Sequence, residues 1–330
     1  MPGILAVVLP QKGKLNSSTY ELMSAGHDLA GKSGEPFWAA VIGAGASALA
    51  QELVERGADK VFVLEHPSFE NLLDDSFTAA LAALAGAEKP SKILFASTVA
   101  GRSISARLSV HLKAGVAADV SEFLSAGAGT LKARRTYYSG NLLAEVEIKS
   151  PVAVATIQGL AWPQAERQPG RAGEIVKAAV QPAPSRIEFS SFQAEESNEI
   201  DLATAERVVS GGRGIGSAEG FKAIRDLAHS IKAAVGASRA VVDSGWIAYR
   251  HQVGLTGKAV RPKLYIACGI SGQIQHLAGM SASPNIVAIN TDPDCPMMKV
   301  ASVSVVGDLL EFLPLVTAEI KKRKGVPVAA

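Results

Sequence analysis

Cysteine is scarce in this sequence. The 330 residues include two cysteines, Cys268 and Cys295, and neither belongs to a CxxC motif or to a Cys/His cluster. Such a sequence offers no disulfide framework and no thiolate metal site, which favours a reducing compartment. We therefore expect a cytoplasmic protein without a bound metal. Cys268 is expected to be a small buried hydrophobe and Cys295 a loop thiol.

An excess of charge of one sign is also lacking. Lys and Arg number 33 against 31 Asp and Glu. A chain so balanced creates no large field that would attract nucleic acid or an anionic membrane surface. No apolar stretch approaches the length of a membrane span, and nothing resembling a signal peptide precedes the first apolar run at residues 3–9. We expect no nucleic-acid partner and no membrane insertion.

Arrangements for nucleophilic catalysis are missing as well. His27, His66, His111 and His229 have no partner at triad or ligand spacing, which favours surface or structural roles. His251 lies next to a glycine-containing loop, where a role in a ligand loop and a surface role are equally supported. In the first half, the run 43–45 (GAG) lacks the third glycine of a dinucleotide fingerprint, so a tight turn is favoured over a nucleotide site.

What the sequence does have is the composition of an α/β protein, with 48% hydrophobic and 19% charged residues. Its length favours two domains. In the first half, apolar runs alternate with helical spacing, which indicates parallel strands joined by helices. Two further runs around the turn-prone residues 139–141 indicate an antiparallel hairpin and hence a mixed sheet. The predicted strands are 4–9, 37–42, 60–64, 92–96, 131–138 and 143–148, and the predicted helices are 20–29, 46–56 and 77–84.

Composition shifts after Trp162, where prolines and a polar stretch indicate a connector and not a core element. We predict an N-terminal α/β domain over residues 1–195, with the Pro-rich connector from about 163, and a second α/β domain over 196–330. In this second domain the predicted strands are 207–209, 240–242, 264–267, 286–289 and 303–306, and the predicted helices are 218–235, 274–280 and 308–322.

Glycines and small polar residues directly follow two of these strands, in the runs 210–214 (SGGRG) and 269–272 (GISG). In a parallel sheet these runs lie at the carboxyl ends of strands, where ligands bind. The second run opens a predicted helix, whose free N–H groups suit a pyrophosphate. Glycines at such places are equally common as tight turns, so the runs alone leave both readings open.

Longer runs resemble the alpha subunits of electron transfer flavoproteins. The order and spacing match over residues 208–315, whereas the first domain is similar in layout but weaker in motif. The resemblance is carried by the runs 236–239 (GASR), 251–258 (HQVGLTGK), 264–280 (LYIACGISGQIQHLAGM) and 286–293 (IVAINTDP).

The resemblance implies FAD in an extended pose on a DHS-like, Rossmann-like second domain, beside an electron transfer flavoprotein beta subunit in an obligate heterodimer. It places Arg239 against the flavin ring and His276 at the pyrimidine side, where a hydrogen bond or a positive charge stabilises negative charge. Ser238 and Thr256 match residues that hydrogen-bond the ring. Arg213, Ser271, Asn290 and Asp308 match residues that hold the phosphates, ribityl chain and adenosine. The other implied cofactor-binding residues are Val253, Gly254, Leu255, Gly272, Gln273, Ile274, Gln275 and Leu309.

The resemblance further implies an electron carrier, and not an enzyme that transforms a substrate by itself. Flavoprotein dehydrogenases such as acyl-CoA dehydrogenases would supply the electrons, and a quinone oxidoreductase would receive them. One alternative is a subunit of a flavin-based electron-bifurcating, NADH-oxidising complex. Residues 249–251 (YRH) weakly resemble a run found in such subunits. Another is an adenine-nucleotide-binding regulatory module without redox function. The family usually has Gln where this chain has Leu255, so a hydrogen bond to the cofactor is expected to be absent.

Overall fold

The computed structural model describes residues 2–127, 130–137, 142–179, 182–191, 199–202 and 205–324. The chain forms two compact units, Met1–Gln193 and Ala194–Ala330. The predicted boundary between residues 195 and 196 and the predicted turn at residues 139–141 lie outside the described residues. Among the helices that the structure describes, none has the length and apolar character that crossing a bilayer requires.

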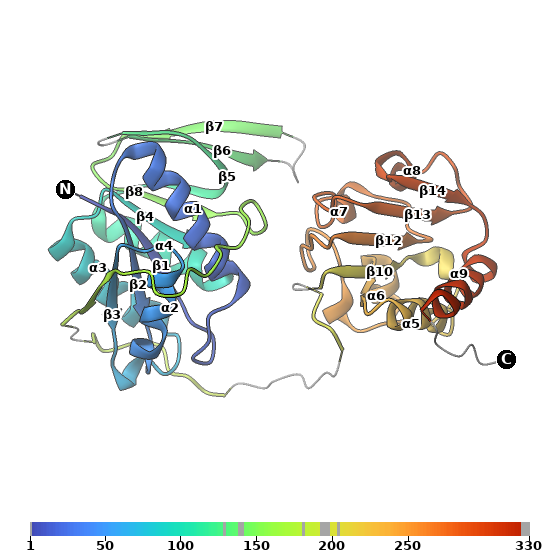
Figure 1. The fold of residues 1–330 in the computed structure, drawn as a ribbon, viewed down its shortest axis with the longest axis horizontal. Helices are drawn as coiled ribbons and strands as arrows, with labels where there is room; N and C mark the ends of the chain where they lie inside the picture. Colours follow the sequence, from blue (N-terminus) through green and yellow to red (C-terminus); the bar gives the residue numbers. More distant parts are fainter. Residues whose placement is uncertain are drawn as a thin grey trace. The chain divides into compact units, whose positions relative to one another are not determined.

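The first unit is built on a nine-stranded sheet. Its strands are β1 (Ile4–Val8), β2 (Phe37–Ile42), β3 (Lys60–Leu64), β4 (Lys92–Ala96), β5 (Gly115–Gly127), β6 (Thr130–Tyr137), β7 (Leu142–Ile148), β8 (Ala153–Ile157) and β9 (Glu174–Lys177). They lie in the order β7-β6-β5-β8-β4-β1-β2-β3-β9 (Figure 1). β6 runs antiparallel to β5 and β7, and the other neighbours pair in parallel. The predicted mixed sheet is confirmed.

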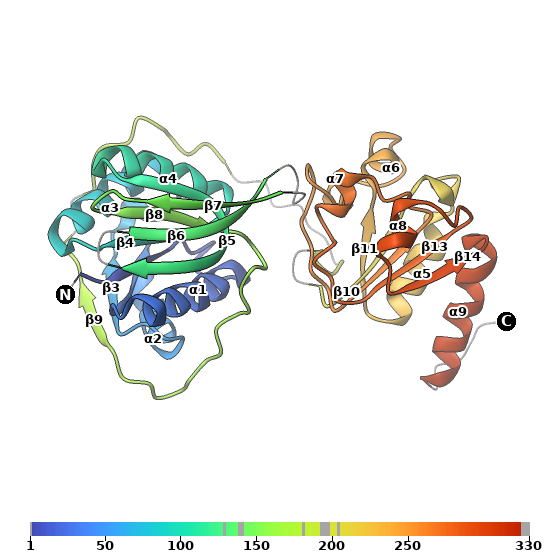
Figure 2. The same ribbon diagram turned by 90° about the horizontal axis from the view of Figure 1, so that it is seen from above.

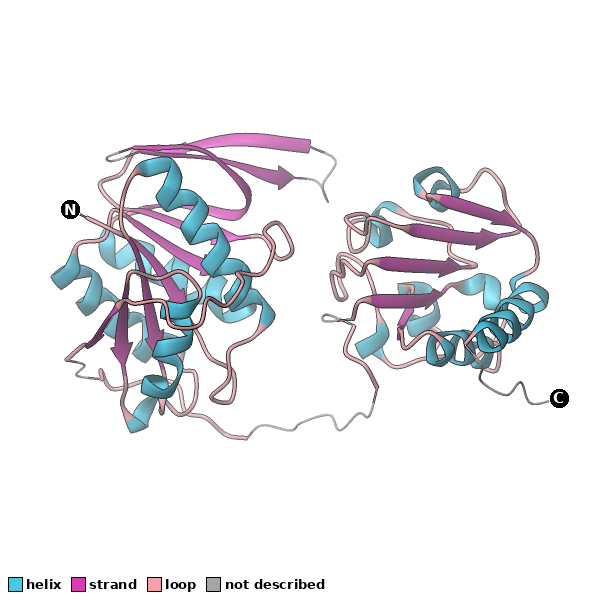
Figure 3. Cartoon of the chain, viewed as in Figure 1, coloured by secondary structure: helices cyan, strands magenta, loops and turns pink. Residues whose placement is uncertain are grey.

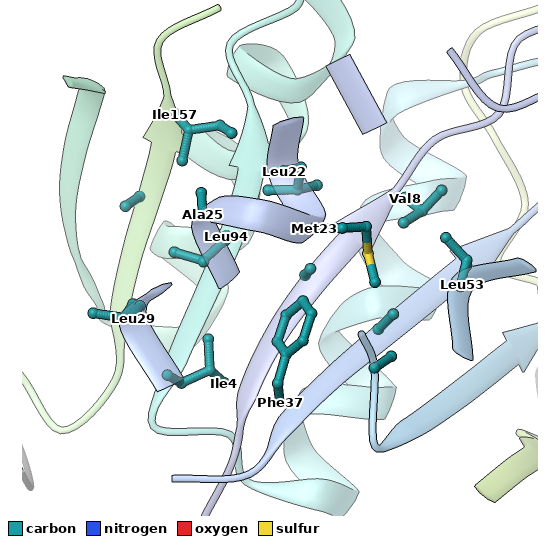
Figure 4. Close-up of a cluster of buried hydrophobic side chains, with 14 of the residues drawn as sticks. Ile4, Val8, Leu22, Met23, Ala25, Leu29, Phe37, Leu53, Leu94 and Ile157 are labelled. Atoms are coloured by element: carbon teal, nitrogen blue, oxygen red, sulfur yellow. The ribbon is translucent and has the colours of Figure 1, made fainter. Parts of the chain in front are cut away.

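Helices cover both faces of this sheet. They are α1 (Ser17–Ser33), α2 (Ala50–Glu55), which follows a 3-10 turn (Ala46–Leu49), α3 (Asp74–Glu88) and α4 (Val99–Leu112). Because side chains alternate along a strand, Ile4 and Val8 of β1 belong to the cluster that contains Leu22 and Leu29 of α1 (Figure 4). Leu5 of the same strand belongs to the cluster beneath α3 and α4. Figure 2 shows the two helix pairs on opposite sides of the sheet. This arrangement leaves both faces buried, as a parallel sheet requires.

The segment after Trp162 contains a strand, which corrects its interpretation as a connector without core elements. β9 adds to the edge of the sheet in parallel with β3. Residues ahead of β9 are held to the unit by ion pairs, from Arg167 to Glu55 at 2.5 Å and from Arg171 to Asp59 at 2.8 Å. β9 itself contains no proline, so the prolines around it did not prevent an edge strand from forming.

The second unit has a wholly parallel five-stranded sheet (Figure 3). Its strands are β10 (Arg207–Gly211), β11 (Ala234–Ala237), β12 (Leu264–Cys268), β13 (Ile286–Asn290) and β14 (Val303–Val306), in the order β11-β10-β12-β13-β14. The helices are α5 (Phe221–Ser230), α6 (Arg239–Asp243), α7 (Ile274–Leu277), α8 (Pro296–Val300) and α9 (Leu309–Arg323). The predicted α/β fold with a Rossmann-like second domain is confirmed.

Two neighbouring elements of this unit differ from prediction. The predicted helix 218–235 ends early, because Lys232 has a left-handed backbone with φ of 53°, and β11 follows directly after it. The predicted strand 240–242 is instead part of α6. Short apolar runs do not distinguish a helix from a strand, and here pairing with β10 decides which segment enters the sheet.

Alternation along the strands again divides the core into two layers. Val209, Ile266 and Cys268 face a cluster shared with α5 and α9. Val208 and Tyr265 face the opposite cluster, which includes methionines from α8. The strand ends, and not the packed faces, are thereby left to carry a binding site.

Candidate functional site

A cavity of about 570 Å³ lies at the carboxyl ends of β10 and β12. β10 is the first strand of the unit and has β11 on one side and β12 on the other, so this is the switch point at which doubly wound sheets bind ligands. The loops after the two strands are joined by backbone bonds: the Gly212 N–H donates to the Cys268 carbonyl at 2.8 Å and the Gly214 N–H to that of Gly269 at 3.1 Å. The volume is within the range of roughly 300–1,000 Å³ common for ligand pockets.

Most of the predicted site residues line this cavity, although they come from loops far apart in the sequence. They are Arg213, Ser238, Arg239, Val253, Gly254, Leu255, Thr256, Ser271, Gln273, Gln275, His276 and Asn290. Convergence of these loops at one strand edge is what the parallel order of the strands dictates.

Four predicted residues do not line the cavity in the described part of the chain. The Asp308 carboxylate accepts from the Leu310 N–H at 2.7 Å and so caps α9. Leu309 is buried in the core, where it lies directly against Gly269. Gly272 packs against the backbone of Met297, and Ile274 is exposed at the start of α7. Asp308, Leu309 and Gly272 support the lining loops from outside the cavity.

Other residues of the lining were not singled out from the sequence as site residues. They are Gly214, Ala240, Asp243, Gln252, Gly269, Ile270, Asp292 and Cys295. Most stand beside predicted site residues in the same runs, so proximity in sequence was the signal for them. Cys295 lies in the loop before α8, as expected, and its free thiol is buried.

Glycines allow the backbones around the cavity to approach one another. A Cβ on Gly212 would overlap the Gly269 carbonyl oxygen, and one on Gly269, whose φ is +62°, would lie 2.8 Å from the Gly214 Cα. Elsewhere, a Cβ on Gly279 would lie 2.5 Å from the Gly254 Cα. These positions admit glycine alone because any side chain would push two loops apart.

The predicted turn after β12 is present, but the helix that it opens, α7, has only four residues. Asn290 holds the turn in place, since its Nδ2 donates to the Ile270 carbonyl at 3.1 Å. A helix of this length adds little dipole, so an anion here would rely on the N–H groups and side chains of the turn itself.

The loop before Gly257 is fixed at both ends. The Val253 N–H donates to the Ala237 carbonyl at 2.9 Å and the Leu255 N–H to that of Gln275 at 2.7 Å. The buried Gln252 side chain donates through Nε2 to the Thr256 Oγ1 at 3.0 Å. Hydrogen bonds within the chain therefore hold both ends of this loop in place.

His251, just before this loop, is buried, so its interpretation as a surface residue is wrong. Its Nδ1 lies 2.8 Å from the Val235 carbonyl and its Nε2 lies 3.1 Å from Glu199. The ring is not part of the described cavity wall and anchors the loop from outside it.

His276 is a buried titratable residue of the cavity wall. It is 6% exposed, and its Nε2 lies 2.9 Å from the hydroxyl of Tyr265, which is 0% exposed. Burial lowers the pKa of His276 to about 4, with the Val253 backbone opposing the shift. Its Nδ1 is buried without a hydrogen-bond partner among the described residues. A buried polar atom left unpaired beside a cavity is what a missing ligand would leave.

Positive charge at the cavity comes from two arginines. Arg239, the first residue of α6, is 67% exposed and pairs with Asp243 at 3.2 Å. Arg213 lies in the loop after β10 and is exposed. An exposed ion pair holds its partners weakly, so the Arg239 guanidinium remains available at the rim.

The buried thiol of Cys268 lies outside the cavity lining. Burial raises the pKa of Cys268 to about 12, so it stays a neutral thiol, as expected for a buried hydrophobe. The described residues contain no group of three or more His, Cys, Asp and Glu side chains that would hold a metal ion.

The parallel sheet, its switch-point cavity and the glycine-lined loops define a dinucleotide-binding α/β protein. Comparison with known families makes this specific. The model described as "Electron transfer flavoprotein FAD-binding domain" matches residues 201–281, and that described as "Electron transfer flavoprotein domain" matches residues 4–183. The chain belongs to the electron transfer flavoprotein alpha-subunit family, it functions in electron transfer, and its cofactor is FAD.

Full-length relatives agree with this assignment. The electron transfer flavoprotein subunit alpha of Thermoanaerobacterium thermosaccharolyticum is 41% identical over 318 residues, 95% of this chain and 96% of that protein. The subunit alpha of Bacillus subtilis is 38% identical, over 94% of each chain. Protein FixB of Clostridium saccharobutylicum is 33% identical over 97% of this chain and 96% of that protein.

Proposed function

We propose that this chain is the FAD-carrying subunit of a cytoplasmic, heterodimeric electron transfer flavoprotein. It pairs with an electron transfer flavoprotein beta subunit, takes electrons from flavoprotein dehydrogenases such as the acyl-CoA dehydrogenases of fatty acid oxidation, and passes them to a quinone-linked oxidoreductase. The observation that carries this proposal is the glycine-lined cavity at the β10/β12 switch point, within the part that matches the FAD-binding domain. We assign residues 196–330 to the FAD-binding domain.

The cavity fits this cofactor. Glycines at positions 212, 214 and 269 let the backbone come close to a pyrophosphate, and His276 has an unpaired buried nitrogen. Bound FAD supplies a ring that accepts and releases electrons. In our proposal Arg213, Ser271 and Asn290 hold the phosphates, ribityl chain and adenosine. Ser238 and Thr256 hydrogen-bond the ring, and Arg239 favours its negatively charged states. Asp308 and Leu309 act indirectly, through α9.

The test is a redox titration of the complex with its beta subunit. Replacing Arg239 with Ala removes a cation from the cavity rim and is expected to lower the flavin midpoint potential while the fold is retained. The matched control is Arg225→Ala, because Arg225 is an exposed arginine of α5 outside the cavity wall. Equal potentials in the Arg239→Ala variant and the unmodified complex would refute the role given to Arg239.

The same preparation tests the other two functions. An electron-bifurcating complex would contain a second FAD and would be reduced by NADH, so we expect one FAD per heterodimer and no reaction with NADH. A colourless complex that binds only AMP or NAD would favour the regulatory module instead. Because a partner is expected to cover the flavin, loss of FAD from the chain expressed alone would not count against the carrier.

A further inference from the structure

The hydroxyl of Tyr265 is placed where a polar group is costly. Tyr265 lies in the middle of the sheet on β12, is 0% exposed, and shares an apolar cluster with Val208, Ala267 and Ala288. Burying a hydroxyl costs free energy unless it is hydrogen-bonded. Its hydroxyl lies 2.9 Å from the Nε2 of His276, and the two rings meet edge to face with centroids 6.2 Å apart.

The direction of this hydrogen bond follows from the groups involved. Burial raises the pKa of Tyr265, with Ser210 opposing, so the phenol keeps its hydrogen. That hydrogen needs an acceptor, and Nε2 is the acceptor that the described contacts provide. A neutral imidazole has one donor and one acceptor nitrogen. If Nε2 accepts, the ring hydrogen is on Nδ1.

A hydrogen bond in the opposite direction, from His276 Nε2 to the Tyr265 oxygen, is less favourable. If Nε2 donated to the phenol oxygen, the phenol hydrogen would have to turn to the Ser210 hydroxyl, and Nδ1 would be a bare lone pair although the Val253 backbone favours a hydrogen on the ring. A doubly protonated ring would bring two hydrogens into a site where burial disfavours charge. The contacts therefore select one protonation state of His276.

We propose that Tyr265 is a positioning residue, whose hydroxyl donates to His276 Nε2 and holds that imidazole in the neutral form with its hydrogen on Nδ1. The cavity wall then presents a neutral ring at His276, and positive charge at the cavity comes from the arginines. This rests on the proposed function only in taking the cavity as the flavin site. In this form His276 would stabilise negative charge through a hydrogen bond and not as a cation.

The protonation state is read directly from long-range proton–nitrogen correlation spectra of the complex labelled with nitrogen-15 in histidine. The chain has six histidines, and a His276→Gln variant assigns the signal of His276. We expect a hydrogen-bearing Nδ1 and a bare Nε2 in the unmodified complex. A hydrogen on Nε2, in either the neutral or the doubly protonated ring, would overturn the proposal.

The positioning role is tested with Tyr265→Phe, which removes a single oxygen atom. We expect the two ring nitrogens to lose their distinct signals, the flavin midpoint potential to shift, and FAD to dissociate roughly tenfold faster, as for the loss of one buried hydrogen-bond partner. The matched control is Tyr137→Phe in the first unit, because Tyr137 is 38% exposed. That variant should leave all three quantities unchanged.

A double variant separates positioning from a general structural effect. If Tyr265 acts through His276, adding Tyr265→Phe to His276→Gln should not change the flavin potential further, whereas additive shifts would contradict the proposal. If Tyr265→Phe does not fold, the spectrum of the unmodified complex still decides the protonation state. A complex purified without flavin would count against the proposed function alone, because the histidine signals remain readable in it.

Discussion

Both sheets place their first strand between two parallel neighbours, which creates a switch point in each unit. In the second unit the point between β10 and β12 opens into a cavity of about 570 Å³. In the first unit the point between β1 and β4 leaves only about 40 Å³. The same strand topology thus gives a cavity of ligand size at one switch point and almost no space at the other.

The difference lies in the residues that follow the strands. Leu9, Leu22 and Leu72 fill the switch point of the first unit, and the first turn of α4 is already satisfied by Thr98, whose Oγ1 accepts from the Gly101 N–H at 3.0 Å. In the second unit, glycines stand at the corresponding turns and leave the space open. Topology therefore provides the location of a site, and side-chain volume decides whether a ligand can enter.

The largest effect is expected from Gly212→Ala. The new Cβ would overlap the Gly269 carbonyl oxygen, so the loops after β10 and β12 must separate and the cradle for FAD is lost. We expect the purified complex to contain no flavin, as measured by its visible absorbance. Gly43→Ala, after β2 in the first unit, is the matched control, because a Cβ there meets nothing within 4 Å. Full flavin content in Gly212→Ala would show that close backbone approach is not needed.

Leu22→Ala tests whether added space alone lets the switch point of the first unit bind a nucleotide. Leu22 is 1% exposed, so truncation should lower the free energy of unfolding by about 2–5 kcal/mol. We expect equilibrium dialysis to detect no new AMP binding, because enlarging the space does not bring backbone N–H groups close to a phosphate. The control Leu142→Ala, at a position 56% exposed, should change stability by less than about 0.5 kcal/mol. New binding of AMP would mean that volume alone separates the two units.

Acid should destabilise the second unit through His276. Its pKa is about 4 in the folded protein and roughly 6.5 when unfolded, so below pH 6.5 the unfolded chain takes up a proton that the folded one does not. The contribution of this pKa difference to the free energy of unfolding is fully present above pH 6.5. It decreases as the pH falls to 4, where about 3 kcal/mol has been lost. Urea unfolding of His276→Gln should show a smaller loss over this range. Parallel pH curves for the two proteins would contradict the assigned burial.

Local patterns predicted the frame of the site well. Apolar runs ending in glycine marked β10 and β12 and their loops, because a buried parallel strand reads as a continuous apolar run. The exchange of strand and helix around α6 was missed, since Ala240, Val241 and Val242 suit both structures and only the pairing of β11 with β10 separates them.

Contacts between distant segments were beyond the reach of sequence patterns. Gly254 of the cavity wall packs directly against Gly279, and Tyr265 reaches His276 from the middle of the sheet. The resemblance implied site roles for Asp308 and Leu309, and local spacing does not show that Asp308 caps α9 while Leu309 packs in the core. The register of β12 against its neighbours, and not local spacing, fixes which of these side chains meet.

The smallest effect is expected from Leu255→Gln, which introduces the residue that the resemblance leads us to expect at this position. Leu255 is 58% exposed on the cavity rim, and its loop is held by its own N–H, so stability should change by less than about 0.5 kcal/mol. The added amide can hydrogen-bond FAD, and we expect about fivefold tighter binding, equivalent to roughly 1 kcal/mol. Leu255→Met keeps the apolar character and should leave the affinity unchanged. Equal gains from Gln and Met in fluorescence titrations would mean that contact area at the rim, and not a missing hydrogen bond, limits how tightly the open switch point holds its cofactor.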